Sequence, residues 1–194
     1  MTDRNITVNG ISYIIEQQIG HGLHSLVYSG YDLRNNQPVA IKIINFMHGS
    51  MSVKADTLAR RQTYSKEIEM LLYLQSLNPY VIRVFNYDHN GRYGVIIMER
   101  GQTIRDLFIS HILGRKSLST SLIRDFWYQM VEAIGYMHRN NIVHGDCKPE
   151  NFIQLDSDRR TLRLIDMGLS FQLPDNVTSI LKPFTGTPGK FLNQ

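Results

Sequence analysis

The chain has 194 residues, of which 42% are hydrophobic and 20% charged; this suits one or two domains with buried cores and excludes a chain that is disordered throughout. Lysine and arginine outnumber aspartate and glutamate by 21 to 17, a net charge of +4, but the basic residues form no tail or stripe, so we expect no nucleic-acid partner. A single cysteine excludes an internal disulfide framework. Because neither a secretory signal nor an apolar run of ~18 residues is found, we expect an intracellular protein, cytoplasmic or nuclear, with no membrane partner.

The first half of the chain alternates short β-rich runs with polar turns. Five strands are expected, at residues 11–19, 26–31, 37–46, 81–87 and 93–98. Apolar residues recur at helical spacing over 54–77, and Asn78-Pro79 ends that pattern. The first half is therefore predicted to be a unit of five strands and one helix.

The second half is richer in helices. A short helix is expected over 103–112, and a longer one ends near Arg139. The longer helix can be capped by any of three residues, Ser119, Thr120 or Ser121. Two short strands, at 152–155 and 162–165, precede a long polar loop that starts at 166. The seam between the two halves is expected at Glu99-Arg100-Gly101, and the predicted class is α+β.

Two glycines lie in the turn between the first two predicted strands, in the segment Ile19-Gly20-His21-Gly22. Glycines allow backbone N–H groups to approach phosphate oxygens closely. The pattern alone is weak, because most such glycine pairs form ordinary hairpins and Ser25 stands where a third glycine is expected. This turn is a candidate phosphate cover.

Lys42 interrupts the apolar strand VAIKII. By itself it is typical of an edge strand, where the aliphatic stem packs and the amine reaches water. A glutamate on the following helix could instead pair with the amine and hold it near a phosphate. Glu67 and Glu69 lie about 200° apart on a helix, so only one can point inward. Glu67 shares the inner side with Ile68 and Leu71, so we choose Glu67 and expect Glu69 in solvent.

The segments HGDCKPEN, residues 144–151, and LIDMG, residues 164–168, carry the remaining chemistry. Asn151 and Asp166 offer the oxygen ligands that Mg²⁺ prefers. Asp146 can accept or orient a hydroxyl proton, and Lys148 can neutralise a phosphoryl group during transfer. Each residue alone is common in turns. Together with the glycine turn, the strand lysine and the helical glutamate, they appear in the order that a protein kinase requires.

The chain resembles a eukaryotic protein kinase from the glycine turn to the activation segment. Three segments are similar to the monopolar-spindle (TTK-type) dual-specificity kinases: VIRVFNYDHNGRYGVIIMERG, DFWYQMVEAIGYMHRNNIVHGDCKPENFI and DNVTSILKPFTGTP. Spindle-checkpoint kinases of the budding-uninhibited type also carry His-Gly-Asp at this loop. The resemblance implies a bilobal protein-kinase-like fold with an N-lobe over 1–98, five-stranded with one helix. A hinge over 99–101 and an incomplete, mainly helical C-lobe over 102–194 would complete it.

The resemblance also implies a role for each candidate residue. Asp146 would be the catalytic base, Lys148 would contact the transferred phosphate, and Asn151 and Asp166 would hold Mg²⁺. The nucleotide-binding residues would be Ile19, Gly20, Gly22, Val27, Ala40, Lys42, Glu67, Met98, Glu99 and Ile153, with Met98 as the gatekeeper. The implied cofactors are ATP and Mg²⁺, and the implied partner is a protein phosphorylated on serine, threonine or also tyrosine. Kinetochore or cell-cycle partners would follow from the subfamily.

Three positions depart from the kinase pattern. Gly145 stands where an arginine normally clasps a phosphate on the activation loop, which puts ordering by phosphorylation through this residue in doubt. Met167 replaces a phenylalanine, and its flexible side chain can preserve apolar packing. Ser25 should stiffen the phosphate cover. The candidate phosphorylation sites are Thr178, Ser179 and Thr185, and Thr187 would line the substrate end of the segment.

A kinase continues with several helices after Gly186-Thr187-Pro188, whereas this sequence ends at Gln194. We therefore expect a truncated product in which the apolar side of the 120–139 helix, including Trp127, is partly exposed. Two alternatives stay open: a nucleotide-binding scaffold that cannot hold a substrate, and a thiol hydrolase using Cys147 with His144 or His138. The hydrolase is the weaker one, because a catalytic pair is normally joined by the fold rather than by adjacency on one loop.

Overall fold

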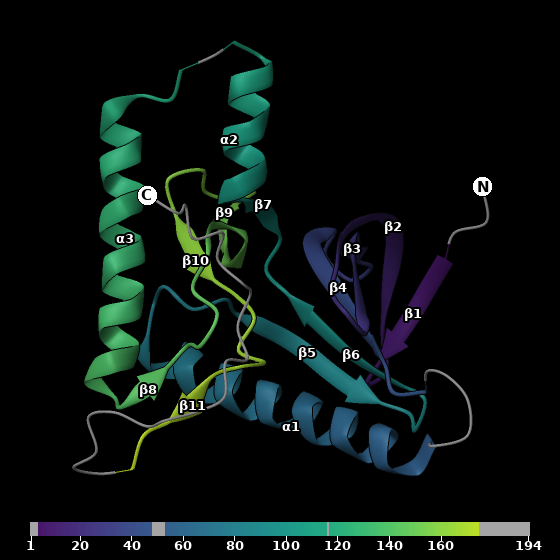
Figure 1. The fold of residues 1–194 in the computed structure, drawn as a ribbon. Coiled ribbons are helices and arrows are strands. Elements are labelled where there is room, and N and C mark those ends of the chain that lie inside the picture. The colour runs from purple at the N-terminus through teal and green to yellow at the C-terminus, as the bar shows by residue number, and fades with distance from the viewer. Residues whose placement is uncertain (1–3, 48–52, 116, 175–194) are drawn as a thin grey trace.

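The computed structural model describes residues 4–47, 53–115 and 117–174 (Figure 1). The N-terminal half contains β1 (Arg4–Val8), β2 (Ile11–His21), β3 (Ser25–Asp32), β4 (Gln37–Asn45), α1 (Val53–Leu77), β5 (Val84–His89) and β6 (Tyr93–Met98). The C-terminal half contains β7 (Gly101–Thr103), α2 (Ile104–Leu113), α3 (Thr120–Arg139), β8 (Ile142–Val143), a short 3-10 helix (Pro149–Asn151), β9 (Phe152–Leu155), β10 (Leu162–Leu164) and β11 (Phe171–Gln172). The bilobal α+β fold expected from the sequence is confirmed.

One antiparallel sheet forms the N-terminal half, in the order β1-β2-β3-β4-β6-β5. It has six strands, so the prediction of five was wrong. The missed strand, β1, is only RNITV, which is too short and too polar to show a clear alternation. Figure 1 shows the sheet curled above α1, while α2 and α3 stand together on the opposite side of the molecule.

Asn86 brings the two edges of this sheet together. Its Nδ2 donates to the carbonyl of Val8 over 2.8 Å and to the hydroxyl of Tyr13 over 3.1 Å, and Asn9 donates back to its Oδ1 over 3.0 Å. The curled sheet thereby encloses a small core of its own, formed by Val8, Tyr13, Val39, Ile41, Val95 and Ile97. The other face of the sheet packs toward α1 as part of the larger core.

Two local boundaries differ from the sequence prediction. The strand expected over 81–87 begins at Val84, because the chain just before it pairs instead with the C-terminal half: the N–H of Ile82 donates to the carbonyl of Leu164 over 3.0 Å. The loop expected from 166 onward contains β11, which pairs antiparallel with β8. Both differences arise from partners that are distant in sequence.

Helices α2 and α3 begin at side-chain caps. Thr103 accepts a hydrogen bond from the N–H of Asp106, and Ser119 accepts one from the N–H of Leu122. Ser119 is therefore the cap among the three residues considered. The larger core continues from the underside of the sheet, through α1, to α3 and β10, so the two halves share one apolar interior.

Candidate active site

Lys42 lies in the middle of the sheet, because β4 is hydrogen-bonded to β3 on one side and to β6 on the other. Side chains alternate along a strand. Val39 and Ile41 enter the small core, whereas Ala40 and Ile44 enter the large one, so Lys42 points with the latter toward α1. The edge-strand interpretation of Lys42 is thereby overturned.

Glu67 meets Lys42 from α1. The Lys42 Nζ lies 2.5 Å from Glu67 Oε1, and the two side chains are only 14% and 7% exposed. Glu69 is exposed, as helical periodicity predicted. Burial opposes the charge of the amine, but Glu67 and then Asp166 outweigh that effect and raise the pKa of Lys42 above its ordinary value. Lys42 is therefore a fixed, permanently charged cation at physiological pH.

Asp166 approaches the same amine from the C-terminal half, with its Oδ1 3.8 Å from Lys42 Nζ. Its backbone has φ 64°, in the left-handed region that aspartate tolerates better than most residues. The next residue, Met167, is 2% exposed in the large core. Met167 thus anchors the segment by apolar packing and leaves the Asp166 carboxylate beside Lys42 and 47% exposed.

The loop between β8 and β9 gathers Asp146, Lys148 and Asn151. Lys148 Nζ lies 2.7 Å from Asp146 Oδ2. The Asn151 amide donates to the carbonyl of Asp146 over 2.8 Å and to its Oδ2 over 3.2 Å. Asn151 also connects this loop to the Asp166 segment, because the N–H of Ile165 donates to its carbonyl over 2.9 Å. The predicted residues of the two motifs are therefore brought together.

A magnesium ion fits the donors at this junction. Asn151 and Asp166 present an amide and a carboxylate oxygen, the hard ligands that Mg²⁺ prefers, and Mg²⁺ commonly takes only one or two protein ligands beside phosphates. Among the residues that the structure describes, no three or more His, Cys, Asp or Glu side chains form a metal-binding group. A magnesium ion held by Asn151 and Asp166 would take its other ligands from phosphate oxygens or water.

His144 is only 3% exposed and supports the loop between β8 and β9. The N–H of Asp146 donates to its Nδ1 over 3.3 Å, so the ring proton is on Nε2, which lies 3.1 Å from the carbonyl of Ile165. Burial lowers the pKa of His144 below its ordinary value of 6.5. The neutral ring therefore supports Asp146, and a second proton would break that contact.

The folded protein should lose stability as the pH falls below about 6.5, because the unfolded chain then takes up a proton that the folded His144 refuses. The free energy of unfolding in urea should be lower at pH 5.5 than at pH 7.5. His144→Gln should flatten this dependence, whereas the exposed His138→Gln should preserve it. Equal stability at both pH values in the wild type would contradict a buried, neutral His144.

Gly145 is required by its backbone. Its φ is 81°, and a Cβ added there would lie 2.7 Å from the carbonyl oxygen of Leu169. An arginine at this position would have to displace the segment that follows Asp166. Glycine at position 145, where kinases normally carry an arginine, therefore lets the loop between β8 and β9 pack closely against the segment that follows Asp166.

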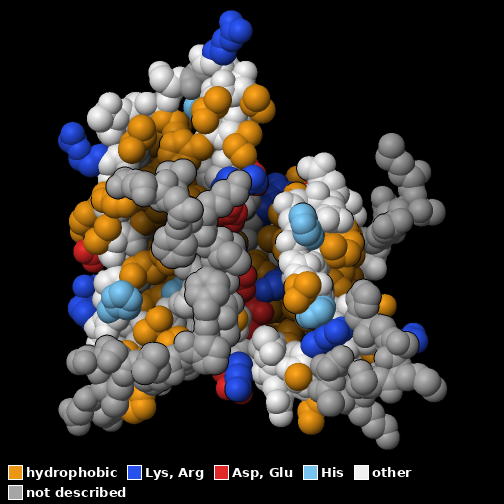
Figure 2. All heavy atoms as spheres, viewed as in Figure 1, with side chains coloured by type: hydrophobic (Ala, Val, Ile, Leu, Met, Phe, Trp, Pro, Cys, Tyr) orange, Lys and Arg blue, Asp and Glu red, His pale blue; other side chains and the backbone are white. Residues whose placement is uncertain are grey.

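The remaining predicted nucleotide residues lie in or against the large core and at the tip of the β2–β3 hairpin. Ala40, Met98 and Ile153 are only 6%, 8% and 6% exposed, and Val27 packs against the same core. Ile19 and Gly20 lie on β2, and the N–H of Gly22 donates to the carbonyl of Ser25 over 2.8 Å, closing the hairpin tip. Thr178, Ser179, Thr185 and Thr187 lie outside the described residues. Figure 2 shows charged side chains of both signs in the hollow between the halves.

The side chain of Glu99, a predicted nucleotide-binding residue of the hinge, is engaged within the protein. Its carboxylate accepts hydrogen bonds from the N–H of Arg83 and from Arg163 Nε, both over 3.0 Å. The side chain therefore braces the hinge, and the N–H of Glu99 donates to the carbonyl of Arg83 over 3.0 Å, so the carbonyl of Glu99 is the group to consider for a nucleotide contact. No pattern in the sequence indicates the contact with Arg163, because Arg163 lies 64 positions from Glu99 on a strand without a distinctive pattern.

The pairing of Cys147 with His144 finds no support in the geometry, whereas His138, the other histidine considered, lines the same apolar groove as Cys147. Burial, and then the neighbouring Asp146 carboxylate, raises the pKa of the Cys147 thiol, so a reactive thiolate is disfavoured. Both ring nitrogens of His144 are engaged with the backbone. Cys147 instead lines an apolar groove.

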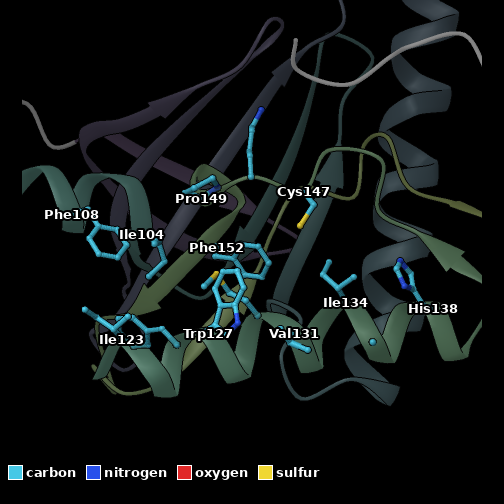
Figure 3. A pocket seen from close by; sticks show the side chains of 14 residues that line it. Ile104, Phe108, Ile123, Trp127, Val131, Ile134, His138, Cys147, Pro149 and Phe152 are labelled. Atoms are coloured by element: carbon cyan, nitrogen blue, oxygen red, sulfur yellow. The ribbon is translucent and has the colours of Figure 1, made fainter. Parts of the chain in front are cut away.

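That groove, of about 640 Å³, runs between α2, α3 and the catalytic loop. Figure 3 shows the side chains that border it, including Phe108, Trp127 and Val131. Trp127 is 67% and Val131 54% exposed, so the expected exposure of this side of α3 is confirmed. The groove is adjacent to the catalytic loop but contains none of the predicted metal ligands.

Within the described residues, no helix combines the length and apolar character that a membrane crossing requires.

The family model "Protein kinase domain" matches residues 13–189. The chain is 32% identical to the dual specificity protein kinase Ttk of Danio rerio, over 93% of the chain and 17% of that protein. It is also 32% identical to the dual specificity protein kinase TTK of Mus musculus, over 91% of the chain and 19% of that protein. It is 30% identical to the serine/threonine-protein kinase mph1 of Schizosaccharomyces pombe, over 90% of the chain and 24% of that protein. The chain thus spans less than a quarter of the length of each of these relatives. It belongs to the protein kinase domain family.

Proposed function

We propose that the chain is an ATP-dependent protein kinase that transfers the γ-phosphoryl group to serine and threonine hydroxyls of a protein, and also to tyrosine. One observation carries the proposal: Lys42, paired with Glu67 and 3.8 Å from Asp166, faces a loop in which Lys148 and Asn151 both contact Asp146. Phosphoryl transfer depends on this combination of positioned cations, oxygen ligands and a carboxylate.

Each residue has a distinct task in the proposed reaction. Lys42 holds phosphate oxygens of the nucleotide, and Glu67 keeps its amine in place. Asn151 and Asp166 would hold Mg²⁺, which when bound neutralises charge on the phosphates. Asp146 orients the substrate hydroxyl and accepts its proton at Oδ1 or Oδ2. Lys148 stabilises the negative charge of the transferred group.

The wider assignment rests on the relatives. Two of them are named dual specificity protein kinases, which supports tyrosine as an additional acceptor. The TTK-type resemblance supports a role in the spindle checkpoint, with kinetochore or cell-cycle partners, in the cytoplasm or nucleus. A second candidate, a nucleotide-binding scaffold without transfer, is favoured by the exposed groove on α3 beside the catalytic loop.

A transfer assay separates the two candidates. The 194-residue chain is incubated with Mg²⁺, ATP labelled in the γ-phosphate and casein, and labelled amino acids are then identified after hydrolysis. The kinase predicts labelled serine or threonine, and dual specificity adds labelled tyrosine. Stabilisation by Mg²⁺ and ATP with no label on casein or on the chain itself would contradict the kinase and favour the scaffold.

A further inference from the structure

Arg100, in the hinge, contacts both halves of the molecule. Its Nε lies 2.6 Å from Asp156 Oδ2, in the turn after β9, and its Nη1 lies 3.6 Å from Glu16 Oε2 on β2. Its guanidinium also lies 5.1 Å from the ring centre of Tyr31 on β3. The backbone repeats the connection to the C-terminal half, because the N–H of Asp156 donates to the carbonyl of Arg100 over 3.0 Å.

These contacts are held in place by burial and charge. The Arg100 side chain is only 18% exposed, although both carboxylates are more than 40% exposed. Burial opposes its charge, but Asp156 and Tyr31 more than offset this and keep its pKa above the ordinary value. A planar guanidinium can meet a carboxylate at its edge and an aromatic ring at its face at the same time. Arg100 therefore joins the β2–β3 hairpin to the turn after β9, which lies far away along the chain.

The position of Arg100 connects it to the nucleotide cleft. A polar cavity of about 550 Å³ lies between the β2–β3 hairpin and the hinge, and it is lined by Glu16, Tyr31, Arg100 and Asp156 together with Ile19 and Gly101. Ile19 belongs to the predicted nucleotide site, and Glu16 precedes Gly20 by four residues on the same strand. Any shift of Glu16 and Tyr31 relative to the hinge would change the position of the glycine turn above the nucleotide cleft.

We infer that Arg100 is a positioning residue that clamps the β2–β3 hairpin to the hinge and to the C-terminal half, and so fixes the height of the glycine turn above the nucleotide. The effect on nucleotide use rests on the proposed function, whereas the clamp itself does not. Glu99, the preceding residue, is held from the other side by Arg83 and Arg163. Consecutive hinge residues are thus fixed to both halves.

The clamp is tested first by a distance that does not depend on activity. Spin labels are attached at Gln18→Cys on β2 and Arg139→Cys at the end of α3, with Cys147→Ser removing the native thiol. Arg100→Met should broaden the distance distribution and shift it to longer values, and Arg100→Lys should shift it less. The matched control is Arg160→Met, since Arg160, 77% exposed, pairs with Asp125 within the C-terminal half and the Asp125 side chain is itself 45% exposed.

Kinetics supply the second measurement. Arg100→Met should raise the KM for ATP by about three- to tenfold, the combined effect expected of one aromatic and two partly exposed ionic contacts, and change kcat by less than about twofold. Arg160→Met should change neither. Distances and KM in Arg100→Met that match those of Arg160→Met would overturn the clamp. If the wild type transfers no phosphate while the distances still change, the clamp stands and the proposed function fails.

Discussion

Replacing Asp146 by asparagine is expected to slow phosphoryl transfer by about 10²- to 10⁴-fold, the usual contribution of a general acid or base. Asparagine has nearly the same shape, and its oxygen can still accept the hydrogen bond from the Asn151 amide, which now reaches Asp146 Oδ2 over 3.2 Å. It cannot accept the proton of the substrate hydroxyl. Nucleotide affinity should remain within about threefold of the wild type, because neither Lys42 nor Asp166 is altered.

The matched control is Asp125→Asn. Asp125 lies on α3 and pairs with Arg160 at 3.6 Å, with about half of its side chain in solvent. Rates from a labelled-ATP assay should match the wild type for this variant. Equal rates for wild type and Asp146→Asn would remove Asp146 from the reaction and overturn the assignment of the loop.

Lys42→Met should abolish transfer and also destabilise the fold. Methionine fills the space of the aliphatic stem, but the Glu67 carboxylate, 7% exposed, is left without its cation. Removing one partner of a buried pair typically costs about 3–5 kcal/mol, because the other charge remains buried. Urea unfolding should therefore show a lower free energy of unfolding, and calorimetry should show weaker ATP binding.

A double variant separates the structural effect from the chemical one. Lys42→Met with Glu67→Gln removes both charges, so much of the lost stability should return while transfer stays absent. Recovery of transfer in the double variant would contradict a direct role for Lys42 at the phosphates. A single Lys42→Met variant as stable as the wild type would show that the pair is not buried as described.

Patterns local in sequence predicted a large part of the fold and of the site. Helical periodicity distinguished Glu67 from Glu69, and the alternation of β4 placed Lys42 among apolar neighbours. The residues of the catalytic loop lie within eight positions of each other, so their spacing was informative by itself. Short-range rules work here because the turn, the helix face and the strand face are set by neighbouring residues.

Contacts between distant segments could not be predicted in this way. The local sequence around Lys42 is typical of an edge-strand lysine, whereas the strand order places β4 between β3 and β6. The strand β1 depends on its pairing with β2 and on Asn86, 78 positions from Val8. Arg100 and Arg163 meet partners 56 and 64 positions away, and neither stands in a periodic pattern. The requirement for glycine at position 145 comes from the close approach of the carbonyl of Leu169, which the neighbouring sequence does not indicate.

The magnesium dependence of ATP binding tests the central claim most directly. Calorimetric titration of ATP should give a higher affinity with Mg²⁺ than with a chelator, because Asn151 and Asp166 are assigned to hold the metal against the phosphates. Asp166→Asn should remove most of this difference, while its affinity without Mg²⁺ should be unchanged or higher, since one negative charge near the phosphates is lost. A wild type that binds ATP equally well with and without Mg²⁺, or an Asp166→Asn variant with the full magnesium effect, would contradict the assignment of this cleft as a phosphoryl-transfer site.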